Sequence, residues 1–135
     1  MKMAIRSLVI AAMFCSSGCG PSVPPTYPVS GTITYDGKPV TDGDILFVPL
    51  DRSLGPDAGK IDGGKYTLQA KAGKCRVEIT ALDIGPDTPI IQGSPVASNY
   101  IPARYNSKTE LIVEVSADGN NVFDFPLESG GGSSK

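Results

Sequence analysis

Glycine and proline interrupt this chain at short intervals, and that spacing constrains its fold more than any other sequence feature. The 135 residues include 16 glycines and 12 prolines, distributed along the whole chain. Both residues favour turns and interrupt helices, whereas a strand needs only roughly four to eight residues between turns. No window has apolar residues at the i, i+3, i+4, i+7 spacing of an amphipathic helix. The sequence therefore predicts short strands joined by turns.

Six segments have the length and composition of strands. The clearest is residues 74–80, where Cys75, Val77 and Ile79 alternate with polar residues. This alternation is typical of a strand with one buried face. The other segments are residues 29–35, 44–49, 65–70, 110–115 and 121–127.

Turn residues separate these segments and support an all-β fold. Asp36-Gly37 and Asp62-Gly63-Gly64 are typical of tight turns, because glycine and aspartate tolerate positive φ. Six or seven short strands in about 100 residues indicate an antiparallel β-sandwich. The predicted core is Val29, Ile33, Ile45, Phe47, Tyr66, Leu68, Cys75, Val77, Ile79, Leu111, Val113, Val115, Phe123 and Phe125.

The first 19 residues have the pattern of an export signal. Lys2 and Arg6 supply positive charge, and an apolar run at residues 8–14 follows them. The run is too short to span a bilayer as a helix. Small residues at positions 16–18 then precede Cys19, as a signal-peptidase site requires. Residues 1–18 are therefore predicted to be a signal peptide.

Residues 16–19 (SSGC) resemble the lipobox of bacterial lipoproteins. The resemblance implies that Cys19 becomes the first mature residue and carries a diacylglyceryl group on its thiol. Ser16 departs from the pattern, which has an aliphatic residue there, and Gly20 in place of aspartate implies sorting to an outer membrane. The alternative is plain secretion, in which an unlipidated Cys19 could pair with Cys75. The proline-rich stretch at residues 19–28 would form the tether between lipid and domain.

Four motifs in sequence order resemble the carboxypeptidase-regulatory-like, or transthyretin-like, domain found in short bacterial lipoproteins. They are residues 29–40 (VSGTITYDGKPV), 45–49 (ILFVP), 62–68 (DGGKYTL) and 73–79 (GKCRVEI), and residues 100–111 add a further likeness. The resemblance implies a prealbumin-like or Ig-like Greek-key β-sandwich of about seven strands. It places this domain at residues 29–128 and leaves residues 129–135 as a flexible tail.

The composition argues against several kinds of chemistry. The chain has no histidine and a net charge of −2, so the usual general base and a basic surface for nucleic acid are both missing. Hydroxyisourate hydrolases, which share the transthyretin-like fold, use histidines and a C-terminal Tyr-Arg-Gly-Ser that this chain lacks. These observations predict that the chain is not an enzyme, has no catalytic residues, binds no nucleic acid and holds no cofactor or metal. Calcium at Asp36, Asp42, Asp44 and Asp62 is the alternative, since these carboxylates lie in or beside turns.

The long segment 83–109 is the place where the sequence predicts binding. Segments of this length between strands are often functional, and tyrosine and arginine are favoured at binding surfaces. Tyr100, Arg104 and Tyr105 therefore form the candidate binding loop. The alternative is a crossover between two sheets in which Ile101 and Tyr105 pack onto the core.

Together these patterns predict an exported module tethered to a membrane of the cell envelope by a lipid on Cys19. The module would lie on the outer membrane or a periplasmic face and serve protein interaction or envelope structure without catalysis. Its protein partner cannot be named from these residues. The alternative function is a carbohydrate-binding module on the cell surface, for which Tyr27, Tyr100 and Tyr105 are the candidate aromatic contacts.

Overall fold

The computed structural model describes residue 20, residues 22–83 and residues 89–130. Within these residues the fold is all-β, as predicted, with one 3-10 turn, η1 (Ala103–Tyr105). The strands of the main sheet are β1 (Thr26–Tyr35), β2 (Lys38–Pro39), β3 (Asp42–Pro49), β4 (Asp57–Asp62), β5 (Lys65–Lys71), β6 (Gly73–Thr80), β11 (Ile112–Val115), β12 (Asn121–Val122) and β13 (Phe125–Leu127). Two short pairs lie outside it: β7 (Leu82–Asp83) with β10 (Ser98–Asn99), and β8 (Ile90–Ile91) with β9 (Ser94–Pro95).

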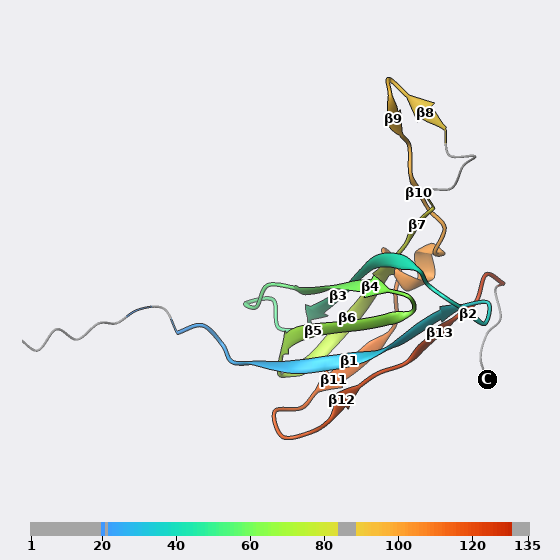
Figure 1. Cartoon of the computed structure of the whole chain (residues 1–135). Coiled ribbons are helices and arrows are strands. Elements are labelled where there is room, and N and C mark those ends of the chain that lie inside the picture. The colour runs from blue at the N-terminus through green and yellow to red at the C-terminus, as the bar shows by residue number, and fades with distance from the viewer. Residues whose placement is uncertain (1–19, 21, 84–88, 131–135) are drawn as a thin grey trace, which may run out of the picture.

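The main sheet curls around one core to give a sandwich-like body (Figure 1). Its order is β11-β6-β3-β4-β5-β1-β12, so β6 lies beside β3 while β3, β4 and β5 follow one another as hairpins. This is the spatial order of a Greek key. The described residues contain more strands than the roughly seven predicted, because the short strand β2 and the two short pairs outside the main sheet add to the count.

The predicted turns are confirmed. Asp36 and Gly37 have φ values of 48° and 78°, and Gly63 and Gly64 have values of 55° and 79°. These are the conformations of a type I′ turn, whose twist matches that of the two flanking strands. The first turn joins β1 to β2 and the second joins β4 to β5.

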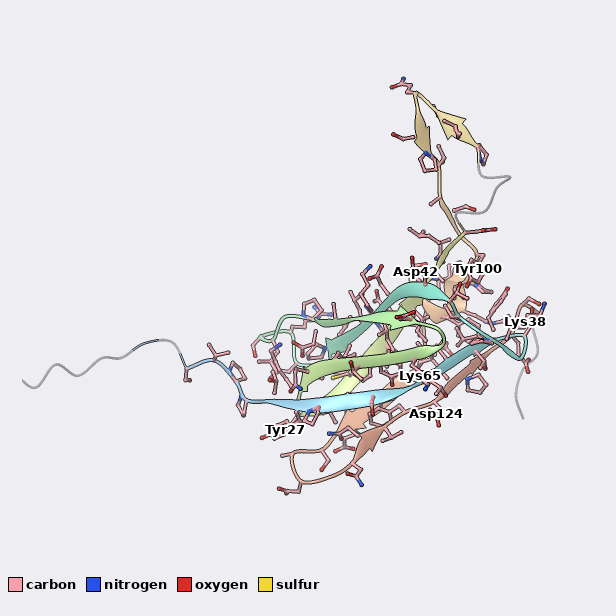
Figure 2. The ribbon with its side chains drawn as sticks, viewed as in Figure 1. Tyr27, Lys38, Asp42, Lys65, Tyr100 and Asp124 are labelled. Carbon is pink, nitrogen blue, oxygen red and sulfur yellow. The ribbon has the colours of Figure 1, made fainter. Side chains whose placement is uncertain are left out.

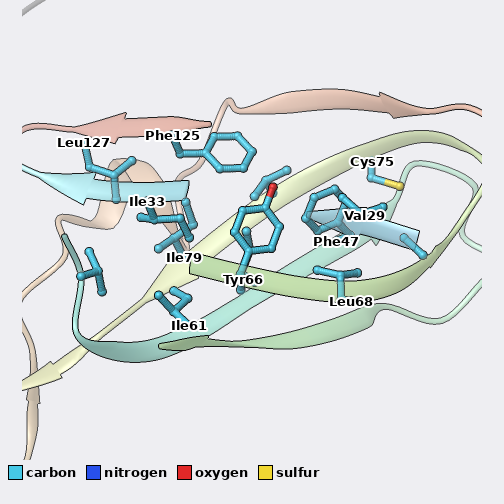
Figure 3. Close-up of a cluster of buried hydrophobic side chains, with 14 of the residues drawn as sticks. Val29, Ile33, Phe47, Ile61, Tyr66, Leu68, Cys75, Ile79, Phe125 and Leu127 are labelled. Atoms are coloured by element: carbon cyan, nitrogen blue, oxygen red, sulfur yellow. The ribbon is translucent and has the colours of Figure 1, made fainter. Parts of the chain in front are cut away.

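The buried side chains come from alternate positions of the strands (Figure 3). In β6, Cys75, Val77 and Ile79 are at most 1% exposed, as their alternation predicts. Three predicted core residues, Leu111, Val113 and Phe123, are only partly buried and pack against the cluster from its rim. The core also contains Ile101, as the crossover alternative expects, and five residues that the prediction missed: Val40, Ile61, Ala70, Ala81 and Leu127.

Strand boundaries differ from the prediction in several places, of which three change the description of the domain. The strand β4 was missed, because its sequence DAGKID has one large apolar residue, Ile61. The predicted strand 121–127 is two strands, β12 and β13, which both pair with β1 in parallel. The first strand begins at Thr26, where it pairs with Lys71, so the predicted tether 19–28 loses its last three residues to the domain.

A single buried amide ties the β11–β12 connection to β1. Asn121 is 5% exposed. Its side-chain Nδ2 donates to the carbonyl oxygens of Ser116 at 2.9 Å and Pro28 at 3.4 Å. Its Oδ1 accepts the Ser116 N–H at 2.8 Å. These bonds join the two ends of the curled sheet, which backbone pairing leaves apart.

Candidate functional site

The predicted binding residues Tyr100, Arg104 and Tyr105 do not form one free surface. Tyr100 is half-buried: its N–H donates to the Ala81 carbonyl at 3.1 Å, and its ring meets that of Tyr35 edge-on at 5.5 Å. Ile101 is buried and Tyr105 packs against the core, as the crossover interpretation predicts. The segment after Tyr100 is therefore part of the sandwich.

Arg104 and Tyr105 hold the C-terminal segment of the same chain. The Arg104 guanidinium donates to the carbonyl oxygens of Glu128 and Gly130, the latter at 2.6 Å, and lies 4.8 Å from the Tyr105 ring centroid. The Tyr105 hydroxyl accepts the Glu128 N–H at 3.2 Å. Both side chains of the candidate binding loop therefore contact the C-terminal segment of their own chain, and a role in binding stays a prediction.

Asp36 completes this C-terminal contact from the turn between β1 and β2. Its Oδ1 accepts the Ser129 N–H at 2.8 Å, and this bond, more than the nearby charge of Arg104, holds the pKa of the carboxyl below its usual range. The predicted tail 129–135 therefore begins later, since Ser129 and Gly130 are bonded to the domain.

The long segment 83–109 contains a projection that the sequence did not predict. We call residues 82–83 and 89–99 the arm; in Figure 1 they rise away from the sandwich. Its tip is a two-residue turn at Gln92 and Gly93, with φ values of 52° and 82°. Its large apolar side chains are exposed: Leu82 48%, Ile90 72%, Ile91 60% and Val96 46%.

The base of the arm is fixed by Asn99. Its Oδ1 accepts the N–H groups of Ala81 and Ile101, both at 3.1 Å, where the arm leaves and rejoins the sandwich. Beside this point lies an open hollow of about 450 Å³, lined by Thr41, Asp42, Leu82, Asp83 and Tyr100. Burial raises the pKa of Tyr100, and the charges of Asp83 and Asp42 raise it further. The hollow is therefore polar and anionic, next to an apolar arm.

The arm and the start of the domain lie at opposite ends of the sandwich. Thr26 pairs with Lys71 at the end where the chain enters. From there β6 runs the length of the sheet to Thr80, which pairs with Asp44 where the arm departs. Figure 1 shows the entering chain and the arm at these two ends.

The tyrosines named for carbohydrate binding are divided between the same two ends. Tyr27 lies in β1 near the entering chain, whereas Tyr100 lies at the base of the arm (Figure 2). Sugar-binding surfaces rely on aromatic faces that act together, and these two rings do not share a face. Tyr105 packs against the core and bonds Glu128.

The four aspartates considered for calcium have separate surroundings. Asp44 pairs with Lys60 at 2.7 Å, and Asp36 bonds Ser129. Asp42 and Asp62 are cross-strand neighbours of β3 and β4. In the part of the chain that the structure describes, no three His, Cys, Asp or Glu side chains gather closely enough to hold a metal ion.

Cys75 lies in the core, as its strand pattern predicts. It is 1% exposed, and burial raises the pKa of its thiol, as does the nearby carboxylate of Asp57. That carboxylate forms a largely buried ion pair with Lys71 at 2.5 Å. A thiol in this setting is a packing residue rather than a reactive one.

The predicted signal peptide 1–18 and Cys19 lie outside the described residues. No helix among the residues that the structure covers is long and apolar enough to cross a membrane.

Comparison with known proteins names no family for this chain. No family model and no curated protein matches it. Among solved structures, a crystal structure of a 9R-lipoxygenase from Cyanothece PCC8801 is similar at a TM-score of 0.35 and 15% sequence identity. The match covers 90% of this chain and 18% of the lipoxygenase chain, so this chain spans less than a fifth of that protein.

The prediction that the chain is not an enzyme is corrected, because the residues it lacks do not exclude catalysis. The missing histidine removes one general base, but carboxylates, phenols and amines can also transfer protons. A TM-score of 0.35 assigns no activity either. Catalysis is therefore neither excluded nor assigned by these observations.

Proposed function

We propose that this chain is an exported, lipid-anchored β-sandwich that presents the arm to a partner protein in the cell envelope. The observation that carries the proposal is the exposure of Ile90 and Ile91 on a projection outside the core. Full burial of an isoleucine side chain contributes about 1.5–3 kcal/mol. Apolar side chains gathered on a projection are typical of interaction sites.

The hairpin itself supports this proposal. The strands β8 and β9 have two residues each and pair only with one another among the described residues. A two-stranded hairpin is marginally stable in water unless a third strand or another surface covers it. A partner that covers the arm would supply the missing apolar contacts.

The position of the arm supports the tethered arrangement. A lipid on Cys19 would lie before β1, at the end of the sandwich opposite the arm. Two or more acyl chains give stable anchoring, whereas one chain does not. The sandwich would then act as a spacer that holds the arm away from the bilayer.

Site-specific photo-cross-linking in cells tests the interaction. A photo-reactive phenylalanine analogue replaces Ile91 in the arm or, as a matched control, the exposed apolar Val122 of β12. We expect a discrete cross-linked species from Ile91 that is absent from Val122 and disappears when Ile90 is changed to Ser. Equal cross-linking from both positions would contradict a role for the arm.

The anchor has a separate test. We expect the intact mass of the mature protein, purified from membranes, to exceed the bare chain from Cys19 by a diacylglyceryl group or more. The variant Cys19→Ala should leave the membrane fraction. A mass equal to that of the bare chain would contradict lipidation and restore the secreted alternative.

A further inference from the structure

The two outer edges of the arm hairpin differ in their ability to accept another strand. Val96 N–H donates to the Pro89 carbonyl at 2.8 Å, and the next cross-strand pair is Ile90 with Pro95. Hydrogen-bonded and non-hydrogen-bonded pairs alternate in an antiparallel ladder. The backbone groups of Ile90 and Pro95 therefore point outward, away from each other.

Proline blocks one of these edges. Pro95 has no N–H, so the outer edge of β9 lacks a donor at this position. Ile90 presents both an N–H and a carbonyl on the outer edge of β8, and β8 has no second partner strand among the described residues. The edge of β8 is therefore the one that can be extended by an added strand.

The negative charge around the arm favours a cationic binding partner over an anionic one. Residues 82–99 contain two aspartates and no lysine or arginine. Asp83 and Asp42 line the hollow at the base of the arm, and neither belongs to an ion pair among the described residues. A second copy of the same arm would meet like charge, and so would an anionic lipid surface. A cationic partner would meet opposite charge.

We propose that the partner of the arm is an extended protein segment with alternating apolar and basic residues, which adds to the edge of β8. Main-chain hydrogen bonds to Ile90 and contacts with the two exposed isoleucines would supply affinity, as in other cases of strand addition. A lysine or arginine of the segment would face Asp83 and Asp42. The inference rests on the proposed function, because it names the class of partner for the same arm.

Peptide binding to the purified full-length chain tests this inference. Three fluorescein-labelled pools of hexapeptides are compared by fluorescence anisotropy. In every pool Val, Ile or Thr occupies alternate positions. The other positions hold Lys or Arg in the basic pool, Gln or Ser in the neutral pool, and Asp or Glu in the acidic pool. The basic pool is expected to bind most tightly, and its affinity should fall as salt is raised. Equal binding of the three pools, or no binding of the basic pool, overturns the inference.

Variants of the arm separate the backbone contribution from the side-chain contribution. Ile90→Pro removes the outward N–H and is expected to weaken binding of the basic pool about tenfold, whereas Ile90→Val should retain it. Asp83→Asn should cost about threefold to fivefold. Ile112→Ser, an exposed apolar residue on β11, is the matched control and should leave binding unchanged. Unchanged binding of Ile90→Pro overturns strand addition.

Two other binding partners of the arm, a second copy of the chain and a lipid surface, would give different experimental results. Concentration-dependent dimers in sedimentation velocity that Ile90→Pro abolishes would overturn the inference in favour of a second copy. Co-sedimentation with phosphatidylglycerol vesicles that Ile91→Ser abolishes would overturn it in favour of a lipid surface.

If cells give the Ile91 cross-link but the basic pool does not bind, this inference fails and the proposed function stands. Absence of the cross-link contradicts the proposed function, whatever the peptides do.

Discussion

Single buried polar groups hold this sandwich together where backbone pairing ends. Asn121 satisfies both backbone groups of Ser116, and the Tyr66 hydroxyl donates to the Phe123 carbonyl at 2.7 Å. Both contacts lie where strands of the curled sheet are not paired with each other. A buried polar group that loses its partner retains its full desolvation cost, so loss of even one such contact lowers the stability of the fold.

Asn121→Ala is expected to lower the free energy of unfolding by about 1–3 kcal/mol, because the backbone groups of Ser116 lose their partner. Urea denaturation of the variant and the parent chain measures this difference. The adjacent, exposed Asn120 provides a matched control, and Asn120→Ala should change the value by less than about 0.5 kcal/mol. Similar losses from both variants would contradict the role assigned to the buried amide.

Tyr66 is expected to make stability depend on alkaline pH. Burial, and secondarily the charge of Asp124, raise its pKa in the folded state above the ordinary value of 10.0. Its contribution to stability is therefore complete below pH 10 and is lost as pH rises above that value, because the unfolded state ionises first. Thermal unfolding between pH 8 and pH 11 measures the loss.

The variant Tyr66→Phe provides the comparison for this pH dependence. It should be less stable at neutral pH by about 0.5–1.5 kcal/mol, because the Phe123 carbonyl loses a donor, yet show a smaller decline above pH 10. Tyr27→Phe, at the partly exposed start of β1, should decline like the parent chain. An unchanged alkaline decline in Tyr66→Phe would assign the effect to another group.

The strand β1 organises the elements around it. Its first seven residues pair with β5, and its last residues pair with β2 and β13. Between these partners, Gly31 lies where the chain segment 122–124 crosses closely, and Phe123 N–H donates to the Ser30 carbonyl at 2.9 Å. Glycine within a strand commonly marks such a close approach of another backbone.

Gly31→Ala is expected to destabilise the domain by about 3 kcal/mol or more, since added atoms in a packed region force the backbone to shift. A Cβ at this position would lie 1.8 Å from the Phe123 carbonyl oxygen. Gly55→Ala is the control, because no atom lies within 4 Å of the equivalent Cβ there. Equal denaturation midpoints for the two variants would contradict the close approach.

At the scale of the whole molecule, the sandwich and the arm have separate roles. The core cluster contains none of the large apolar residues of the arm, which are exposed. The sandwich therefore supplies stability and position, and the arm supplies a surface. Residues 100–106 follow the arm and are held to the sandwich by Asn106, whose Nδ2 donates to the carbonyl oxygens of Ile79 and Ile101 at 3.3 Å and 3.1 Å.

Because the arm lies outside the core, the double variant Ile90→Ser with Ile91→Ser should leave the free energy of unfolding within about 0.5 kcal/mol of the parent chain. By contrast, Ile101→Ser, at a residue that is 3% exposed, should cost several kcal/mol, roughly 2–5. Guanidinium denaturation distinguishes these outcomes. Substantial destabilisation by the arm variant would show that the arm packs against the sandwich.

The sequence by itself determined the features that depend on near neighbours along the chain. Alternation in residues 74–80 predicted which side chains of β6 are buried, and glycine with aspartate predicted both tight turns. Both signals are local, because side-chain direction alternates along a strand and positive φ is a property of single residues.

Only the tertiary structure decided which distant segments meet. Residues 121–127 pair in parallel with β1, and Arg104 and Tyr105 bind the C-terminal segment instead of forming a free loop. The arm was not predicted within segment 83–109, because the exposure of Ile90 and Ile91 depends on where the chain leaves the sheet. Such contacts join residues far apart in the chain, so no local pattern of residues specifies them.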